Sequence, residues 1–105
     1  MQTERGDEMN SQSEVMSLRL YIAAGTPNSI LAVSNLQAIV DEHLVGRHNL
    51  EVIDVLKEPS RAIADGILVT PMLVKLFPPP KVTIIGNLGD KVKVLCALDL
   101  GSALK

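Results

Sequence analysis

Aromatic residues are almost absent from this chain of 105 residues, whose aromatic content of 2% consists of Tyr21 and Phe77. Proteins that bind single-stranded nucleic acid commonly stack its bases on aromatic side chains, so the composition argues against this class of function. The charge balance agrees, since the formal net charge is -2 and phosphate binding needs a clustered excess of lysine and arginine. We therefore expect no nucleic-acid partner.

Cysteine and long apolar runs are also scarce. Cys96 is the single cysteine and cannot close an internal disulfide, and no charged segment followed by a long apolar one opens the chain. No apolar run is longer than Leu20 to Ala24, which is far shorter than the roughly 20 residues of a membrane-spanning helix. We expect a soluble, cytoplasmic protein with no membrane partner.

Hydrophobic residues make up 47% of the chain, enough for one compact domain that buries roughly 60–65% of its unfolded surface. The segment Met1 to Ser17 differs, because it is rich in polar residues and cannot offset the entropy of ordering. We expect a disordered arm over residues 1–17 and a single domain over residues 18–105.

The stretch from Leu18 to Ser29 organises the rest of the chain. Its apolar first part, to Ala24, predicts an inner strand that is covered on both faces. After Gly25, the Thr26 hydroxyl can cap a helix, and Pro27 suits the first helical position. Apolar residues at spacings of three and four extend that helix toward Gly46. The turn can form hydrogen bonds but contains no strong nucleophile.

Further elements follow in an α/β pattern. The β-branched stretch from Leu50 to Leu56 predicts a strand parallel to the first one, joined by a right-handed crossover. A short helix is expected between Pro59 and Gly66. Two apolar strands, Met72 to Phe77 and Lys81 to Ile85, are separated by three prolines that cannot donate to a sheet, namely Pro78, Pro79 and Pro80.

The stretch from Gly89 to Leu100 fits two structures. Alternation is typical of a strand and places one apolar set on a common side, namely Val92, Val94, Cys96, Leu98 and Leu100. A helical period groups another set, namely Val92, Leu95, Cys96 and Leu100, with Asp90 as a cap. Both interpretations stay open.

The order of elements resembles the thioredoxin-like βαβαββα fold, in which a cis-proline at the position of Pro71 lies opposite the turn after the first strand. The chain more specifically resembles the KaiB family of circadian-clock proteins over residues 18–100. The matching segments include Leu20-Tyr21, Thr26 to Ser29, Val52 to Lys57, Pro59, Ile67-Leu68, Thr70-Pro71, Pro78 to Pro80, Ile84 to Gly86, Lys93 to Leu95 and Leu98 to Leu100.

That resemblance implies a non-enzymatic function without a cofactor. Members of the family bind KaiC, a hexameric ATPase, and influence its phosphorylation cycle, and some also capture KaiA. Two folds of one sequence are known in the family, a thioredoxin-like monomer that binds the ATPase and a tetramer in which the last helix becomes a strand. We accordingly expect self-association to a dimer or tetramer, which the limited covering of a small sheet also favours.

The resemblance also implies roles for particular residues. Charged residues that would contact a partner are Lys57, Glu58, Asp65 and Lys75. Positions with a structural or switch role are Thr26, Pro27, Thr70, Pro71, Pro78, Pro79, Pro80, Ala97 and Asp99.

Some positions depart from the family pattern. Relatives commonly carry basic residues where this chain has Leu31, Glu51, Gly66, Val82 and Thr83. Glu51 reverses the sign of the charge, which disfavours a KaiA-type partner. Ala97 replaces a common glycine, and because alanine is better in a helix by roughly 1 kcal/mol, we predict a bias toward the thioredoxin-like form.

Other chemistry has weaker support. A disulfide oxidoreductase needs a reactive thiolate at the helix start, so Cys96 fits a buried structural thiol better, although a redox protein that uses it with an external thiol is the alternative. His43 and His48 lack a third ligand nearby and predict no metal site. Asp54 could act as a base, but bonding to backbone or to a lysine at a sheet end suits it better.

Overall fold

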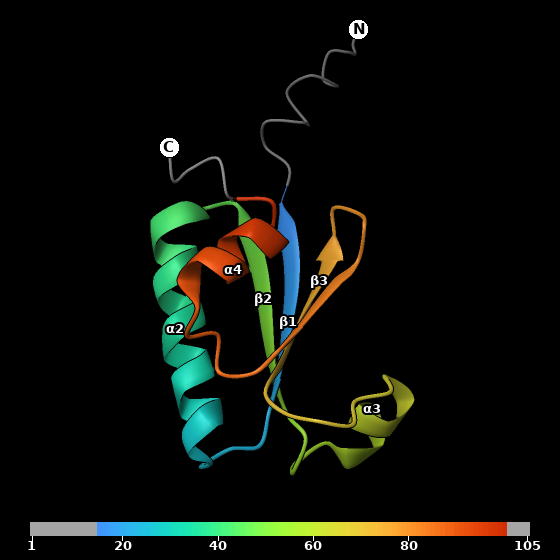
Figure 1. Cartoon of the computed structure of the whole chain (residues 1–105). Coiled ribbons are helices and arrows are strands. Elements are labelled where there is room, and N and C mark those ends of the chain that lie inside the picture. The colour runs from blue at the N-terminus through green and yellow to red at the C-terminus, as the bar shows by residue number, and fades with distance from the viewer. Residues whose placement is uncertain (1–14, 101–105) are drawn as a thin grey trace, which may run out of the picture.

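The computed structural model describes residues 15–100 (Figure 1). Within them, the elements follow the order expected from the sequence. They are β1 (Met16–Ile22), α2 (Pro27–His43), β2 (His48–Asp54), α3 (Pro59–Ala64), β3 (Met72–Phe77), β4 (Val82–Ile85) and α4 (Lys91–Ala97). The predicted βαβαββα arrangement is therefore confirmed.

The strands of this part of the chain form one sheet in the order β2-β1-β3-β4. β1 and β2 run parallel, as expected for strands joined by a crossover helix, whereas β3 is antiparallel to both β1 and β4. β1 is thus an inner strand. Its neighbouring residues Leu20 and Tyr21 point to opposite faces and are both buried, which explains the apolar run in the sequence.

The main core lies between the sheet and the helices α2 and α4, which cover the same face (Figure 1). It contains Leu20 of β1, Leu36 of α2, Leu73 of β3 and Leu95 of α4, all fully buried. Burying one such side chain stabilises the fold by about 1.5–3 kcal/mol. Leu95 brings α4 into this core, so residues 91–97 form a helix, as one of the two interpretations predicted. The predicted helical face is wrong in part, because Val92 and Cys96 are exposed and the buried side chains around Leu95 are Val94 and Leu98.

The opposite face of the sheet carries a smaller core, made of Tyr21, Ile53 and Val74. α3 lies at one end of this face and is only six residues long (Figure 1). Arg19 of β1 and Glu51 of β2 occupy the same face farther along the strands, because side chains alternate along each strand. Charged side chains from separate elements can therefore meet beside α3.

The arm predicted over residues 1–17 is too long at its C-terminal end. Met16 and Ser17 belong to β1, and Met16 is 8% exposed. The Met16 amide donates a hydrogen bond to the Arg47 carbonyl at 2.9 Å, which ties this end of the strand to the segment before β2. Residues 1–14 lie outside the described part of the chain.

The start of α2 differs from expectation in one hydrogen bond. Thr26 is the N-cap residue and Pro27 begins the helix, as predicted, but the Thr26 side chain makes no capping bond. Its Oγ1 donates instead to the Ala23 carbonyl at 2.7 Å, across a turn in which Gly25 has a φ of +87°. Thr26 therefore closes the turn after β1, and the prediction of a hydroxyl cap is wrong.

α4 starts with the cap that the sequence predicts. Asp90 is its N-cap residue, and Oδ1 of Asp90 accepts a hydrogen bond from the Lys93 amide at 3.1 Å. Ala97 is the last residue of the helix, and Asp99 follows with a φ of +65°. The strand interpretation of this segment, with the alternative family fold and the tetramer, stays a prediction.

Candidate partner-binding surface

The turn between β1 and α2 uses its polar groups internally. Ser29 is 2% exposed, and its Oγ accepts a hydrogen bond from the Ala23 amide at 3.0 Å. Asp54, the last residue of β2, accepts from the amides of Ala24 at 3.3 Å and Leu56 at 3.0 Å. The prediction that Asp54 binds backbone groups at a sheet end is confirmed, and this turn has a structural role.

Prolines shape both ends of β3. The Thr70-Pro71 bond is cis, as the resemblance implied, and the buried Pro71 leads directly into the strand. Its carbonyl accepts a hydrogen bond from the Gly86 amide at 3.0 Å, which places the end of β4 beside the start of β3. Pro78, Pro79 and Pro80 connect β3 to β4, as predicted.

Large apolar side chains are exposed on α3 and on the segment that connects it to Thr70. Ile63 is 80% exposed, Leu68 92% and Val69 45%. They line a pocket of about 270 Å³ together with residues such as Val55. Apolar side chains that gather around a hollow commonly mark a binding site. We call Ile63, Leu68, Val69 and this pocket the α3 surface.

Three of the four charged residues expected to contact a partner lie next to the α3 surface. Lys57 and Glu58 are exposed just before α3, and Asp65 directly follows the helix. The fourth, Lys75, is 3% exposed on β3 and shares the helix-covered face of the sheet with Leu73. The expectation that Lys75 contacts a partner therefore does not hold in this fold, because strand alternation turns this side chain away from the surface.

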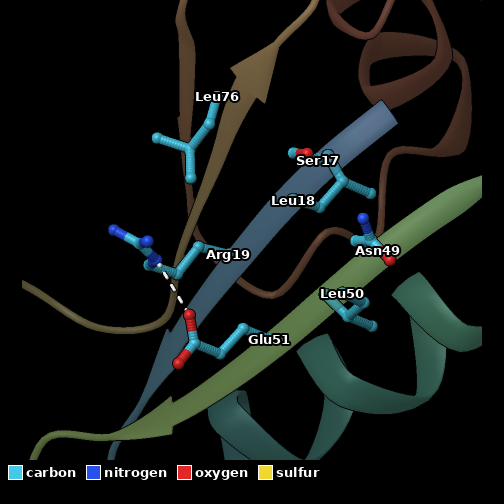
Figure 2. A pocket seen from close by; sticks show the side chains of 7 residues that line it. All are labelled: Ser17, Leu18, Arg19, Asn49, Leu50, Glu51 and Leu76. Atoms are coloured by element: carbon cyan, nitrogen blue, oxygen red, sulfur yellow. Dashed lines mark hydrogen bonds and ion pairs between the residues drawn. The ribbon is translucent and has the colours of Figure 1, made fainter. Parts of the chain in front are cut away.

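A charged cluster connects α3 to the sheet, and no local sequence pattern predicts it. Glu51 of β2 accepts two hydrogen bonds from the Arg61 guanidinium of α3, at 2.6 and 2.8 Å. Figure 2 shows Arg19 of β1 reaching toward Glu51 on the neighbouring strand, with Arg19 Nε 3.2 Å from Glu51 Oε1. The parallel register sets Arg19 beside Glu51. One carboxylate therefore lies between two guanidinium groups.

Tyr21 extends this cluster to the end of α3. Its hydroxyl donates to Asp65 Oδ2 at 2.7 Å and accepts from Arg19 at 3.3 Å. Burial, followed by the hydrogen bond with Asp65, raises the pKa of Tyr21 above its ordinary value of 10.0. Hydrogen bonds from Arg61 lower the pKa of Glu51 below its ordinary value of 4.5. At neutral pH, Tyr21 is thus a neutral donor and Glu51 an anion.

Cys96 lies on α4, away from the α3 surface. Its side chain is exposed, so the prediction of a buried structural thiol is wrong. The inward side of the helix is taken by Val94 and Leu95 instead. The turn after β1, where a thioredoxin-type thiolate would lie, contains no sulfur.

The histidines make separate local contacts. His48 Nδ1 lies 2.9 Å from the Leu44 carbonyl, and His43 Nε2 lies 3.3 Å from Glu42 Oε1. Within residues 15–100, no three His, Cys, Asp or Glu side chains gather as a metal site. Among the same residues, no helix combines the length and the apolar character needed to cross a bilayer.

A four-stranded sheet with this strand order and this succession of helices and strands is a thioredoxin-like fold. Chloroplastic thioredoxin z superposes with a TM-score of 0.70 at 16% identity, over 92% of this chain and 90% of that one. The N-terminal domain of Synechococcus elongatus SasA superposes with a TM-score of 0.67 at 22% identity, over 88% and 87%. These similarities establish the fold.

The sequence places the chain in one family within this fold. A family model for the KaiB domain matches residues 19–100. The circadian clock oscillator protein KaiB of Gloeothece citriformis is 48% identical over 88% of this chain and 87% of its own length. KaiB of Microcystis aeruginosa is 52% identical over 79% and 80%. The chain belongs to the KaiB family, which confirms the resemblance found in the sequence.

Proposed function

We propose that this chain is a cytoplasmic, non-enzymatic regulator that binds a KaiC-type hexameric ATPase and modulates its phosphorylation cycle in a circadian or stress-response timing system. The observation that carries the proposal is membership of the KaiB family. Relatives that are 48% and 52% identical are circadian clock oscillator proteins. Conservation of this kind over most of the chain favours a shared mode of action.

The α3 surface is the part of the molecule best suited to hold the ATPase. Ile63 and Leu68 project from it with exposures of 80% and 92%, and burying such side chains is a main source of binding free energy. Lys57, Glu58 and Asp65 surround them with charge, as the polar rim of an interface surrounds an apolar centre. We infer that these three charged residues contact the partner at this rim.

A binding experiment with matched variants tests the proposal. The chain is mixed with its own KaiC-type ATPase, with and without nucleotide, and the complex is measured by size-exclusion chromatography and calorimetry. Ile63→Asp places a charge at the centre of the α3 surface and should weaken binding by about tenfold or more. Val45→Asp is the control, because Val45 is 72% exposed in the connection between α2 and β2.

Binding that is lost in Ile63→Asp and kept in Val45→Asp supports the α3 surface. Equal effects of the two substitutions would remove this surface from the proposal. No binding of the unmodified chain under any nucleotide condition would overturn the proposed function itself.

A redox function with an external thiol is the alternative, and the exposure of Cys96 leaves that side chain accessible. The alternative predicts insulin reduction or glutathione exchange that disappears in Cys96→Ser. The proposed regulator predicts no such turnover and unchanged ATPase binding in this variant.

A KaiA-type partner is not part of the proposal. This chain has the acidic Glu51 where relatives commonly have a basic residue, which disfavours a KaiA-type partner, and Glu51 is hydrogen-bonded to Arg61. Self-association is proposed as a separate property, which size measurement over a range of concentrations tests directly.

A further inference from the structure

α3 has little apolar contact to keep it in place. The helix is six residues long, and its one buried residue is Ala62. A helix of this length is not stable on its own in water, so its position depends on contacts with the rest of the fold. Its largest apolar side chain, Ile63, points to solvent.

Polar contacts to α3 are more extensive. Arg61 lies at the centre of the helix and binds both oxygens of Glu51, at 2.6 and 2.8 Å. Beyond the helix end, Asp65 binds the Tyr21 hydroxyl at 2.7 Å and lies 3.7 Å from Arg19. These contacts join α3 to the central strand β1 and to the edge strand β2.

We propose that Glu51 and Arg61 form an ionic clamp that positions α3 on the sheet and thereby sets how the α3 surface is presented to its partner. The role in presentation rests on the proposed function, whereas the positioning of α3 is a property of the free protein. The two side chains are 48% and 33% exposed, so salt reaches the clamp. Glu51 and Arg61 are thus positioning residues, and they act through the helix that carries Ile63.

Amide hydrogen exchange of the free, full-length chain tests the positioning role. The reporters are amides bonded across α3, such as Asp65 N to Arg61 O at 2.9 Å and Ile67 N to Ala62 O at 2.9 Å. Glu51→Gln and Arg61→Gln should each speed their exchange by about three- to tenfold, while exchange in α2 stays unchanged. The effect of the double variant should be smaller than the two single effects combined, because both substitutions remove the Glu51–Arg61 contact. It need not equal either single effect, since Glu51 also contacts Arg19 and Arg61 also contacts Glu58 and Asp65.

Two further variants separate the clamp from a general effect of charge. Arg61→Lys keeps the charge but loses the paired geometry, so it should restore only part of the protection. Glu42→Gln is the matched control, since Glu42 is 55% exposed and binds Lys91 of α4 away from α3. Raising the salt concentration to about 1 M should bring the unmodified chain close to Glu51→Gln, because screening then acts within about 3 Å.

The results of hydrogen exchange test the clamp separately from the proposed binding of the ATPase. Unchanged exchange of α3 in Glu51→Gln and Arg61→Gln would overturn the clamp, whatever the protein binds. Faster exchange in these variants supports it even if no ATPase binds. If the ATPase binds, Glu51→Gln should also weaken the complex. Arg61→Lys should bind the ATPase more tightly than Arg61→Gln, to the extent that it restores the protection of α3.

Discussion

Tyr21 on the central strand and Asp65 just after α3 share a hydrogen bond of 2.7 Å, in which the phenol donates to the carboxylate. Tyr21 is 2% exposed, so its hydroxyl has little access to water in the folded protein. The two residues are 44 positions apart in the chain, and their contact fixes the segment after α3 against the sheet.

Removing the hydroxyl should therefore destabilise the domain. Tyr21→Phe keeps the ring in the small second core but leaves Asp65 without this donor, which should lower the free energy of unfolding by about 1–1.5 kcal/mol. Urea denaturation followed by circular dichroism measures the change. A midpoint equal to that of the unmodified chain would show that water replaces the phenol at no cost.

Alkaline stability should reflect the same tyrosine. The pKa of Tyr21 is raised by burial above its ordinary value of 10.0, so the folded state holds the proton more tightly than the unfolded state. The protonated Tyr21 hydroxyl therefore contributes fully to the free energy of unfolding below a pH of 10.0, and this contribution is lost as the pH rises through the raised pKa. Denaturation midpoints between pH 8 and 11 should fall more in the unmodified chain than in Tyr21→Phe.

The contribution of Glu51 to stability should be lost at low pH, whereas that of Tyr21 is lost at high pH. Because Arg61 lowers the pKa of Glu51 below 4.5, its contribution to stability is present above that value and is lost as the pH falls through the lowered pKa. The difference in denaturation midpoint between the unmodified chain and Glu51→Gln should be largest at neutral pH and shrink as the pH falls below 4.5 and through the lowered pKa of Glu51. A difference independent of pH would contradict this role of the carboxylate.

The two aspartates that flank α4 should have opposite effects. Asp90 accepts a hydrogen bond from the Lys93 amide at the positive end of the helix, so Asp90→Ala should cost about 1 kcal/mol of stability. Asp99 lies beyond the negative end with a φ of +65°, so Asp99→Asn should add about 0.3–1 kcal/mol, because asparagine tolerates this conformation without the charge. Thermal unfolding in one buffer should show a lower melting temperature for Asp90→Ala and a higher one for Asp99→Asn than for the unmodified chain.

Ala97 tests the bias toward the helical form of the last segment. Ala97→Gly should weaken α4 by up to about 1 kcal/mol and speed amide exchange around Val94 to Leu98. Carbon chemical shifts of these residues in the unmodified chain should be typical of a helix. Shifts typical of a strand would show that the alternative family fold is the populated one.

Local sequence signals predicted the fold well where they were unambiguous. Pro71 and Pro78 flank β3, and its bounds, Met72 to Phe77, agree with the prediction. Periodicity left residues 89–100 undecided because their apolar residues satisfy two periods, and packing of Leu95 against the core selects the helix in this fold. The strand β1 starts at Met16, before the predicted Leu18, because the polar Ser17 occupies one position of a strand whose side chains alternate between faces.

The candidate site was harder to predict because it depends on contacts between distant segments. Lys75 is polar, yet the strand places it on the covered face. Arg19, Glu51 and Arg61 come from three separate elements, and only the parallel register brings the first two together. The charge reversal at Glu51 was visible in the sequence, whereas its partner Arg61 required the structure.

The affinity of this chain for its own KaiC-type hexamer, measured by calorimetry with the unmodified protein, Ile63→Asp and Val45→Asp, tests the proposed function most directly. The proposed function predicts a stable complex in at least one nucleotide state, a loss of affinity of about tenfold or more for Ile63→Asp, and no change for Val45→Asp. Absence of any complex with the unmodified chain, in every nucleotide state, would contradict it.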